Sequence, residues 1–147
     1  MPDFVVVLFQ TGRHNNQEKN SSKFDSCNIK NIYLKNGRNE VFPRENYNLD
    51  MSKDDLLKLY EGFSAFKRVT TRSTDMYYTP DEFKARRPMF VINASKRKQV
   101  VVNDRTNIKI ICEFHEALPD DTICSVIPIG EKSYVYDVRN ERVTEQF

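Results

Sequence analysis

The chain has 147 residues, of which 39% are hydrophobic and 30% are charged, and its net charge is +2. This length suits one domain with a hydrophobic core, so we expect a single domain over residues 1–147. The ten Phe and seven Tyr make the chain too aromatic for intrinsic disorder. Lys and Arg are spread along the chain without the concentrated basic face of nucleic-acid-binding proteins, so we expect no nucleic-acid partner.

We expect no segment in this sequence that directs a protein to a membrane or out of the cell. Its apolar runs are far shorter than the roughly 20 residues of a membrane-spanning helix. The start, Met1-Pro2-Asp3-Phe4, has no basic segment ahead of an apolar one, so we expect no secretion. Cys27, Cys112 and Cys124 form no Cys-x-x-Cys pair, which indicates reduced intracellular thiols and no zinc site.

The first segments predict three strands. Residues 3–10 are a run of β-branched and aromatic residues without interruption, which predicts a strand buried on both faces. A polar loop follows over residues 13–23. The imperfect alternation of residues 24–34 predicts a second strand. Asn36-Gly37 is a strong type I′ turn signal, and residues 38–42 would form a short return strand.

One helix is predicted over residues 52–67. Ser52 can cap it, and acidic residues follow in its first turn, where the helix dipole favours carboxylates. Apolar side chains recur at helical spacing and should face the core. They are Leu56, Leu59, Tyr60, Phe63 and Phe66. Gly62 should weaken this helix by about 1 kcal/mol relative to Ala.

A long polar connection over residues 68–87 leads to the next buried strand. Within it, Thr79-Pro80-Asp81-Glu82 resembles the start of a short helix, with Thr79 as cap. Pro88 then opens an apolar run through Ile92, which predicts a buried strand. Long connections of this kind often carry function or contacts.

The last third of the chain is rich in β signals. Residues 107–114 alternate between apolar and polar, as in an antiparallel sheet with one wetter face. Residues 122–129 form another strand, and Ile129–Lys132 would turn it into a hairpin with residues 133–138. A final strand follows over residues 143–147. The fold predicted is therefore all-β: an antiparallel β-sandwich of jelly-roll type with one inserted α-helix.

Catalytic and metal-binding motifs are absent from the sequence. Glu113 and His115 would share one face of a strand, but the further ligands of a metal site are missing. The four glycines are isolated, so no phosphate-binding loop is present. Cys112 lies within a strand and is better explained as a small apolar residue than as a nucleophile. We expect no catalytic residue, no metal and no cofactor.

Two basic clusters flank the strand that Pro88 opens, and they leave two interpretations. Arg86 and Arg87 precede it, while Lys96 and Arg97 follow it. Solvated turns explain both clusters; contact with nucleic acid or with an acidic neighbouring subunit is the other interpretation. The adjacent aromatic residues Tyr77 and Tyr78 would be the first candidates for a glycan-binding groove. These six residues form the candidate interface.

Four segments, taken in order, resemble one family. They are Phe24–Leu34, Tyr47–Asp50, Pro88–Ser95 and Asn107–Ile110. Their order is similar to that of the double jelly-roll capsid-like domain in proteins encoded by Maverick/Polinton-type elements and adintovirus-like viruses. The family has Asp-Cys-Ser where this chain has Asn93-Ala94-Ser95. Family proteins contain two jelly rolls, and this chain resembles the C-terminal one alone.

The resemblance implies a non-enzymatic structural protein that assembles with itself or with a related jelly-roll subunit, as a homo-oligomer such as a trimer. Its location would be a virion or the cell interior, and the loops 13–23 and 68–87 would provide the contacts. The alternative is a domesticated jelly-roll module that binds a host protein or a glycan, because the fold does not choose between these functions.

Overall fold

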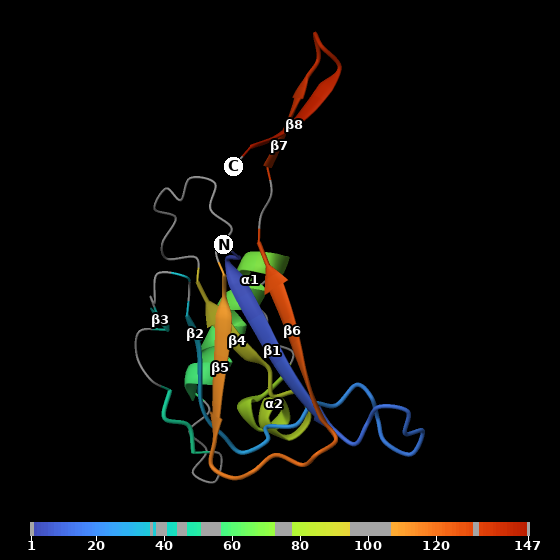
Figure 1. Cartoon of the computed structure of the whole chain (residues 1–147), viewed down its shortest axis with the longest axis vertical. Helices are drawn as coiled ribbons and strands as arrows, with labels where there is room; N and C mark the ends of the chain where they lie inside the picture. Colours follow the sequence, from blue (N-terminus) through green and yellow to red (C-terminus); the bar gives the residue numbers. More distant parts are fainter. Residues whose placement is uncertain are drawn as a thin grey trace.

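The computed structural model contains two facing three-stranded antiparallel sheets, a helical layer and a projecting hairpin (Figure 1). The structure describes residues 2–35, 37, 41–43, 47–50, 57–72, 78–94, 107–130 and 133–146. The strands are β1 (Phe4–Thr11), β2 (Ile29–Lys35), β3 (Val41–Phe42), β4 (Phe90–Asn93), β5 (Lys109–Phe114), β6 (Thr122–Ile129), β7 (Ser133–Asp137) and β8 (Arg142–Gln146). The helices are α1 (Leu57–Thr71) and α2 (Pro80–Arg86).

The first sheet has the order β4-β1-β6, with β1 in the centre. β1 pairs antiparallel with β6 along its whole length, from Phe4 opposite Ile129 to Thr11 opposite Thr122. On its other edge it pairs with β4. The second sheet has the order β3-β2-β5. The predicted all-β, antiparallel, jelly-roll-like architecture is therefore confirmed.

β1 is covered on both of its faces, as its uninterrupted apolar sequence predicts. Side chains alternate between the faces of a strand. Phe9 points toward the second sheet, where its ring meets that of Phe114 with 5.5 Å between centroids. Phe4 points toward the helices, where its ring meets that of Phe66 at 5.4 Å. Phe4 through Phe9 are all buried, so β1 contributes side chains to the core on both of its faces.

The helices cover the outer face of the first sheet (Figure 1). In α1, Leu59 and Phe63 are buried, and Tyr60 and Phe66 pack against the core at its edge, as the helical spacing predicts. α2 attaches through Phe83, whose ring lies 5.3 Å from that of Phe63. The body thus has two helices, whereas the predicted fold had a single inserted helix. The start of α2 at Thr79 was nevertheless recognisable from the sequence. Residues 52–56 lie outside the described residues.

α1 ends at Thr71, and the predicted end at Lys67 is wrong. The threonine hydroxyls extend the helix by donating to carbonyls one turn back: Thr70 Oγ1 to Phe66 O at 2.9 Å and Thr71 Oγ1 to Lys67 O at 2.8 Å. The helix stops where Arg72 adopts the left-handed conformation, with φ of 54°. The two threonines thus lie in the last turn despite the weak helix propensity of this residue type.

Two strand predictions are also corrected. The strand predicted over 24–34 begins only at Ile29, because Cys27 and Asn28 have positive φ angles of 50° and 46° and form a turn. The hairpin predicted at residues 129–132 does not pair β6 with β7. β6 pairs with β1, and β7 pairs with β8. The return strand to β2 is confirmed, with Leu34 opposite Phe42.

Gly62 has a packing role that its low helix propensity conceals. A Cβ atom at this position would lie 3.1 Å from the carbonyl oxygen of Val91 in β4. This separation is closer than ordinary van der Waals contact between carbon and oxygen. Glycine therefore lets the backbone of α1 lie directly against the sheet.

Gly62→Leu should destabilise the protein by about 2 kcal/mol, because the added side chain forces α1 away from β4 and this overpacking outweighs the gain in helix propensity. The control is Ala65→Leu on the exposed side of the same helix, which should change the free energy of unfolding by no more than about 0.5 kcal/mol. Urea unfolding followed by circular dichroism measures both. Equal midpoints for the two variants would contradict the close packing.

Candidate interaction surface

The sandwich is open along β6. In the part of the chain that the structure describes, β6 has a neighbouring strand on one edge only, and the other edge is free. Its side chains are exposed on both faces: Ile123 and Ile127 point to the helix side, and Val126 points to the side of the second sheet. Their exposed fractions are 42%, 46% and 44%. An edge strand that is exposed on both faces is available for pairing.

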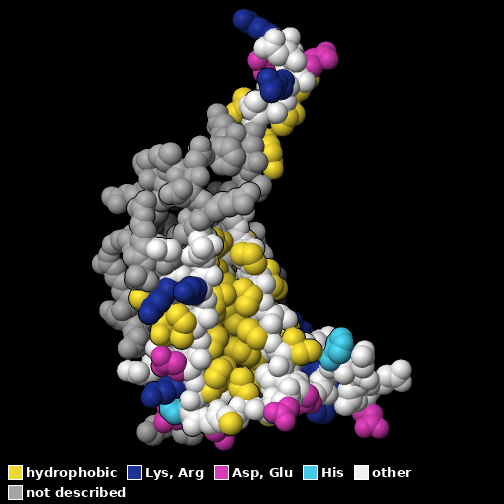
Figure 2. Space-filling model, in the orientation of Figure 1, with side chains coloured by type: hydrophobic (Ala, Val, Ile, Leu, Met, Phe, Trp, Pro, Cys, Tyr) yellow, Lys and Arg dark blue, Asp and Glu magenta, His cyan; other side chains and the backbone are white. Residues whose placement is uncertain are grey.

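An apolar surface surrounds this edge. Figure 2 shows hydrophobic side chains in one continuous area between β5 and β6. Ile110, Cys112 and Phe114 of β5 pack against the core but remain partly exposed. The members of the open edge, as we define it, are Ile123, Cys124, Val126, Ile127 and Pro128. Contiguous exposed apolar surface of this kind marks interaction sites in folded proteins.

β6 lacks the usual protection of an edge strand. Natural proteins place charged residues, especially lysine, on exposed edges to prevent unwanted pairing. From Thr122 to Ile129 the sequence contains no charged residue, and Pro128 is the one residue that cannot donate to a ladder. This composition favours association of β6 with another strand.

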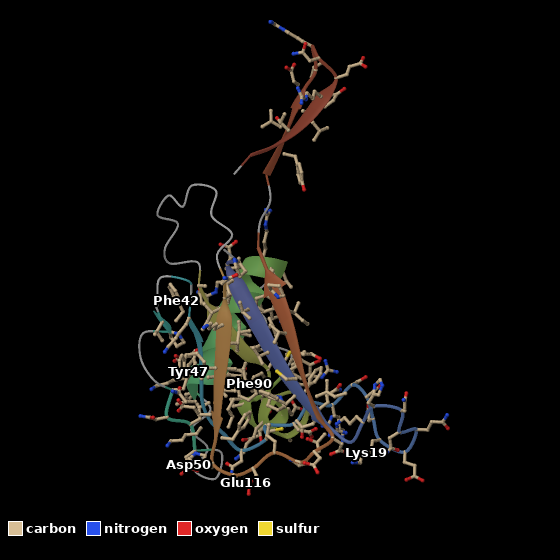
Figure 3. All side chains as sticks on the ribbon, in the orientation of Figure 1. Lys19, Phe42, Tyr47, Asp50, Phe90 and Glu116 are labelled. Carbon is tan, nitrogen blue, oxygen red and sulfur yellow. The ribbon has the colours of Figure 1, made fainter. Side chains whose placement is uncertain are left out.

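The hairpin of β7 and β8 projects away from the body, and we call residues 133–146 the arm (Figure 1). Tyr136 lies opposite Val143 in its ladder, and both are more than half exposed. Side chains stand out from both faces of the arm (Figure 3). The turn is ordered by Asp137, whose carboxylate accepts hydrogen bonds from Asn140 Nδ2 at 2.7 Å and from the backbone N–H of Arg139 at 2.9 Å.

Three cysteines that are distant in the sequence approach one another in the structure. Burial, together with the neighbouring Cys124, raises the pKa of Cys112 to about 11. Burial also raises the pKa of Cys27, which in addition interacts electrostatically with Cys124. All three are free thiols. A raised pKa disfavours the thiolate form at neutral pH, which is the form that a nucleophilic cysteine needs.

The structure describes three of the six candidate interface residues. The Arg87 guanidinium lies over the Tyr78 ring, 5.0 Å from its centroid, and the Tyr78 carbonyl accepts a hydrogen bond from Tyr60 Oη at 2.8 Å. The Tyr78 ring is thus already stacked and is not an open platform for a sugar. Arg86 and Arg87 are exposed at the end of α2. Tyr77, Lys96 and Arg97 lie outside the described residues, and the role of all six as an interface stays a prediction.

The loop over residues 13–23 is anchored at its base. Asp25 accepts two hydrogen bonds from Arg13, at 2.6 and 3.2 Å, and one from the backbone N–H of Thr11 at 2.9 Å. Gln10 Nε2 donates to the carbonyl of Ser21 at 2.7 Å. Burial opposes ionisation of Asp25, but the bonds from Arg13 and Thr11 outweigh it and lower the pKa of the carboxyl. These hydrogen bonds therefore fix the two ends of the loop relative to each other.

The described residues contain no group of three or more His, Cys, Asp or Glu that could hold a metal ion. His115, considered above, interacts through Nε2 with the carbonyl of Leu49 at 3.0 Å. Glu116 accepts a bond from Asn28 Nδ2 at 3.2 Å. Asp50 and Glu116, both labelled in Figure 3, lie at the base of the body. None of the described helices is long and apolar enough to cross a membrane.

Asp25→Asn should destabilise the protein by about 1–2 kcal/mol at pH 7, because it removes a charge-assisted, two-bonded pair with Arg13. The control is Glu18→Gln, an exposed carboxylate in the same loop, which should have little effect. Since the pKa of Asp25 is lowered on folding, its contribution is present above the ordinary aspartate pKa of about 3.9 and is lost as the pH falls through the folded value. Urea midpoints measured between pH 7 and pH 3 test this: the gap between wild type and Asp25→Asn should narrow in acid. A constant gap would contradict it.

Comparison with known proteins gives one match. The family model described as double jelly roll-like domain matches residues 1–132. Neither the curated proteins nor the solved structures contain a match to this chain. The matched residues include both sheets and both helices of the body, and the arm lies beyond them.

Proposed function

Because the chain belongs to the double jelly roll-like domain family, we propose that it is a capsid-like structural module that acts by self-assembly. The observation that carries the proposal is the open edge: an uncharged strand, exposed on both faces, at the side of a sandwich. An enzyme would instead need a constellation of catalytic groups, and the raised pKa of Cys112 does not favour a reactive thiolate.

The proposal includes an origin and a location. A viral or Maverick-type element as the source accounts for the order of motifs along the chain, and a location in a virion or inside the cell follows from that source. Assembly would be with further copies or with a related jelly-roll subunit, and a trimer is one such assembly. The exposed charges at the end of α2, Arg86 and Arg87, would then lie beside an acidic surface of a neighbour.

The energetic argument for assembly comes from the exposed apolar area. Burial of apolar surface contributes roughly 25 cal/mol per Å², and the open edge presents three large aliphatic side chains nearly half exposed, Ile123, Val126 and Ile127. A free strand edge adds main-chain hydrogen bonds to this contribution when a further strand pairs with it. An isolated copy gains neither this apolar burial nor these main-chain hydrogen bonds.

The open edge generates a direct test. Val126→Lys should shift the protein toward monomer, because it places a charge on the surface that would be buried in the assembly. Val126 is exposed in the single copy, so folding should be preserved. The control is Leu57→Lys on the exposed surface of α1, which should leave the assembly unchanged. Light scattering after size exclusion, over a range of concentrations, measures the mass. A wild-type protein that is monomeric at the highest concentration would overturn the proposal.

A further inference from the structure

Within the part of the chain that the structure describes, the arm is a separate two-stranded sheet. β7 pairs with β8 and with no other strand among the described residues. An isolated two-stranded hairpin is marginally stable in water. The apolar side chains of the arm, Tyr134, Val135, Tyr136, Val138 and Val143, are all exposed. The arm therefore has the composition of an element that is stabilised by docking.

The sequence indicates which surface it docks on. The turn-like segment Ile129-Gly130-Glu131-Lys132 favours an antiparallel hairpin of β6 with β7. In the structure this pairing is not made, since β7 pairs with β8 and β6 has a free edge. The strand that this turn signal would place beside β6 is β7, and in the structure β7 is paired with β8 instead. A contact favoured within a chain, yet unmade there, can be made between two identical copies by exchange of the element.

Charge and length are compatible with this pairing. When β7 runs antiparallel to β6, the tip of the arm lies beside the start of β6. The tip carries the exposed Arg139 and Arg142, whose charge is balanced by Asp137 and Glu141. It therefore has no net charge to repel the exposed Asp120 and Asp121, which immediately precede β6. Along the strand itself, β6 has no charged side chain to oppose the arm's apolar residues. At about 3.3 Å per residue, β7 spans roughly 16 Å, which fits within the roughly 26 Å of β6.

We propose that the arm of one copy adds to the open edge of a second copy, with β7 antiparallel to β6. This inference rests on the proposed self-assembly and names its contact. In the register set by a turn at residues 129–132, Val126 of one copy faces Val135 of the other, and Ile123 faces Val138. The exchange covers the apolar side chains of both the arm and the open edge.

The test is site-directed cross-linking between two differently tagged full-length chains produced together. One chain carries Val126→Cys and the other Val135→Cys, both with Cys124→Ser to remove the exposed native thiol. A short bismaleimide should give a covalent dimer that contains one chain of each tag. The pair Ile123→Cys and Val138→Cys should give the same product if the first pair impairs folding. In the control, Val69→Cys on the exposed surface of α1 replaces Val135→Cys, and the mixed dimer should be lost.

The outcomes separate this inference from the proposed function. A double variant with Val126→Cys and Val135→Cys in one chain, cross-linked as a monomer only, would show that the arm closes on its own β6 and would overturn the exchange. An oligomeric wild type with no cross-link at either pair would also overturn the exchange, while self-assembly would stand. A wild type that is monomeric throughout, with no mixed dimer, would overturn both.

Discussion

The burial of six successive residues of β1, Phe4 through Phe9, is the constraint on which the structure depends. A strand with apolar side chains on both faces needs a cover on each, and the chain supplies two different ones: the β3-β2-β5 sheet on one side and the α1–α2 layer on the other. β1 also pairs with a strand on each edge, with β6 along its whole length and with β4 over Phe4–Val7. The position of every other element follows from its place around this strand.

The elements that surround β1 are not equally covered. β4 lies under α1 so closely that Gly62 is needed at the crossing. β6, on the opposite edge, extends beyond the helical layer and beyond the second sheet, and its two faces remain open. The first sheet is thus covered at β4 and exposed to solvent at β6. This asymmetry gives the molecule a direction for association, which a sandwich with two equally covered edges would lack.

Sequence patterns predicted the parts of the fold that depend on local chemistry. The apolar run of β1, the helical stripe of α1, the cap at Thr79 and the limits of β6 could all be recognised, because each follows from periodicity or from turn residues. Pairing between distant strands could not. β6 has apolar side chains on both of its faces, and this pattern does not distinguish a central strand from an edge strand. The sequence therefore predicted the nearby β7 as the partner of β6, whereas the actual partner is the distant β1.

The candidate site was predictable to a smaller extent for the same reason. Exposed charges and aromatic residues near α2 were found from their clustering in the sequence, whereas the open edge consists of residues that look like core. Their exposure is a property of how far the neighbouring layers reach. The approach of Cys27, Cys112 and Cys124 likewise depends on tertiary contacts between three separate elements.

The place of β1 in the chain has a consequence for how the protein folds. β1 precedes both of its partner strands, which lie far along the chain at residues 90–93 and 122–129. The ladders of this apolar strand therefore close large loops of chain. Folding dominated by such distant pairings is slow and leaves apolar strands uncovered on the way. Chaperone supply and synthesis rate should thus influence the yield of this protein as much as its final stability does.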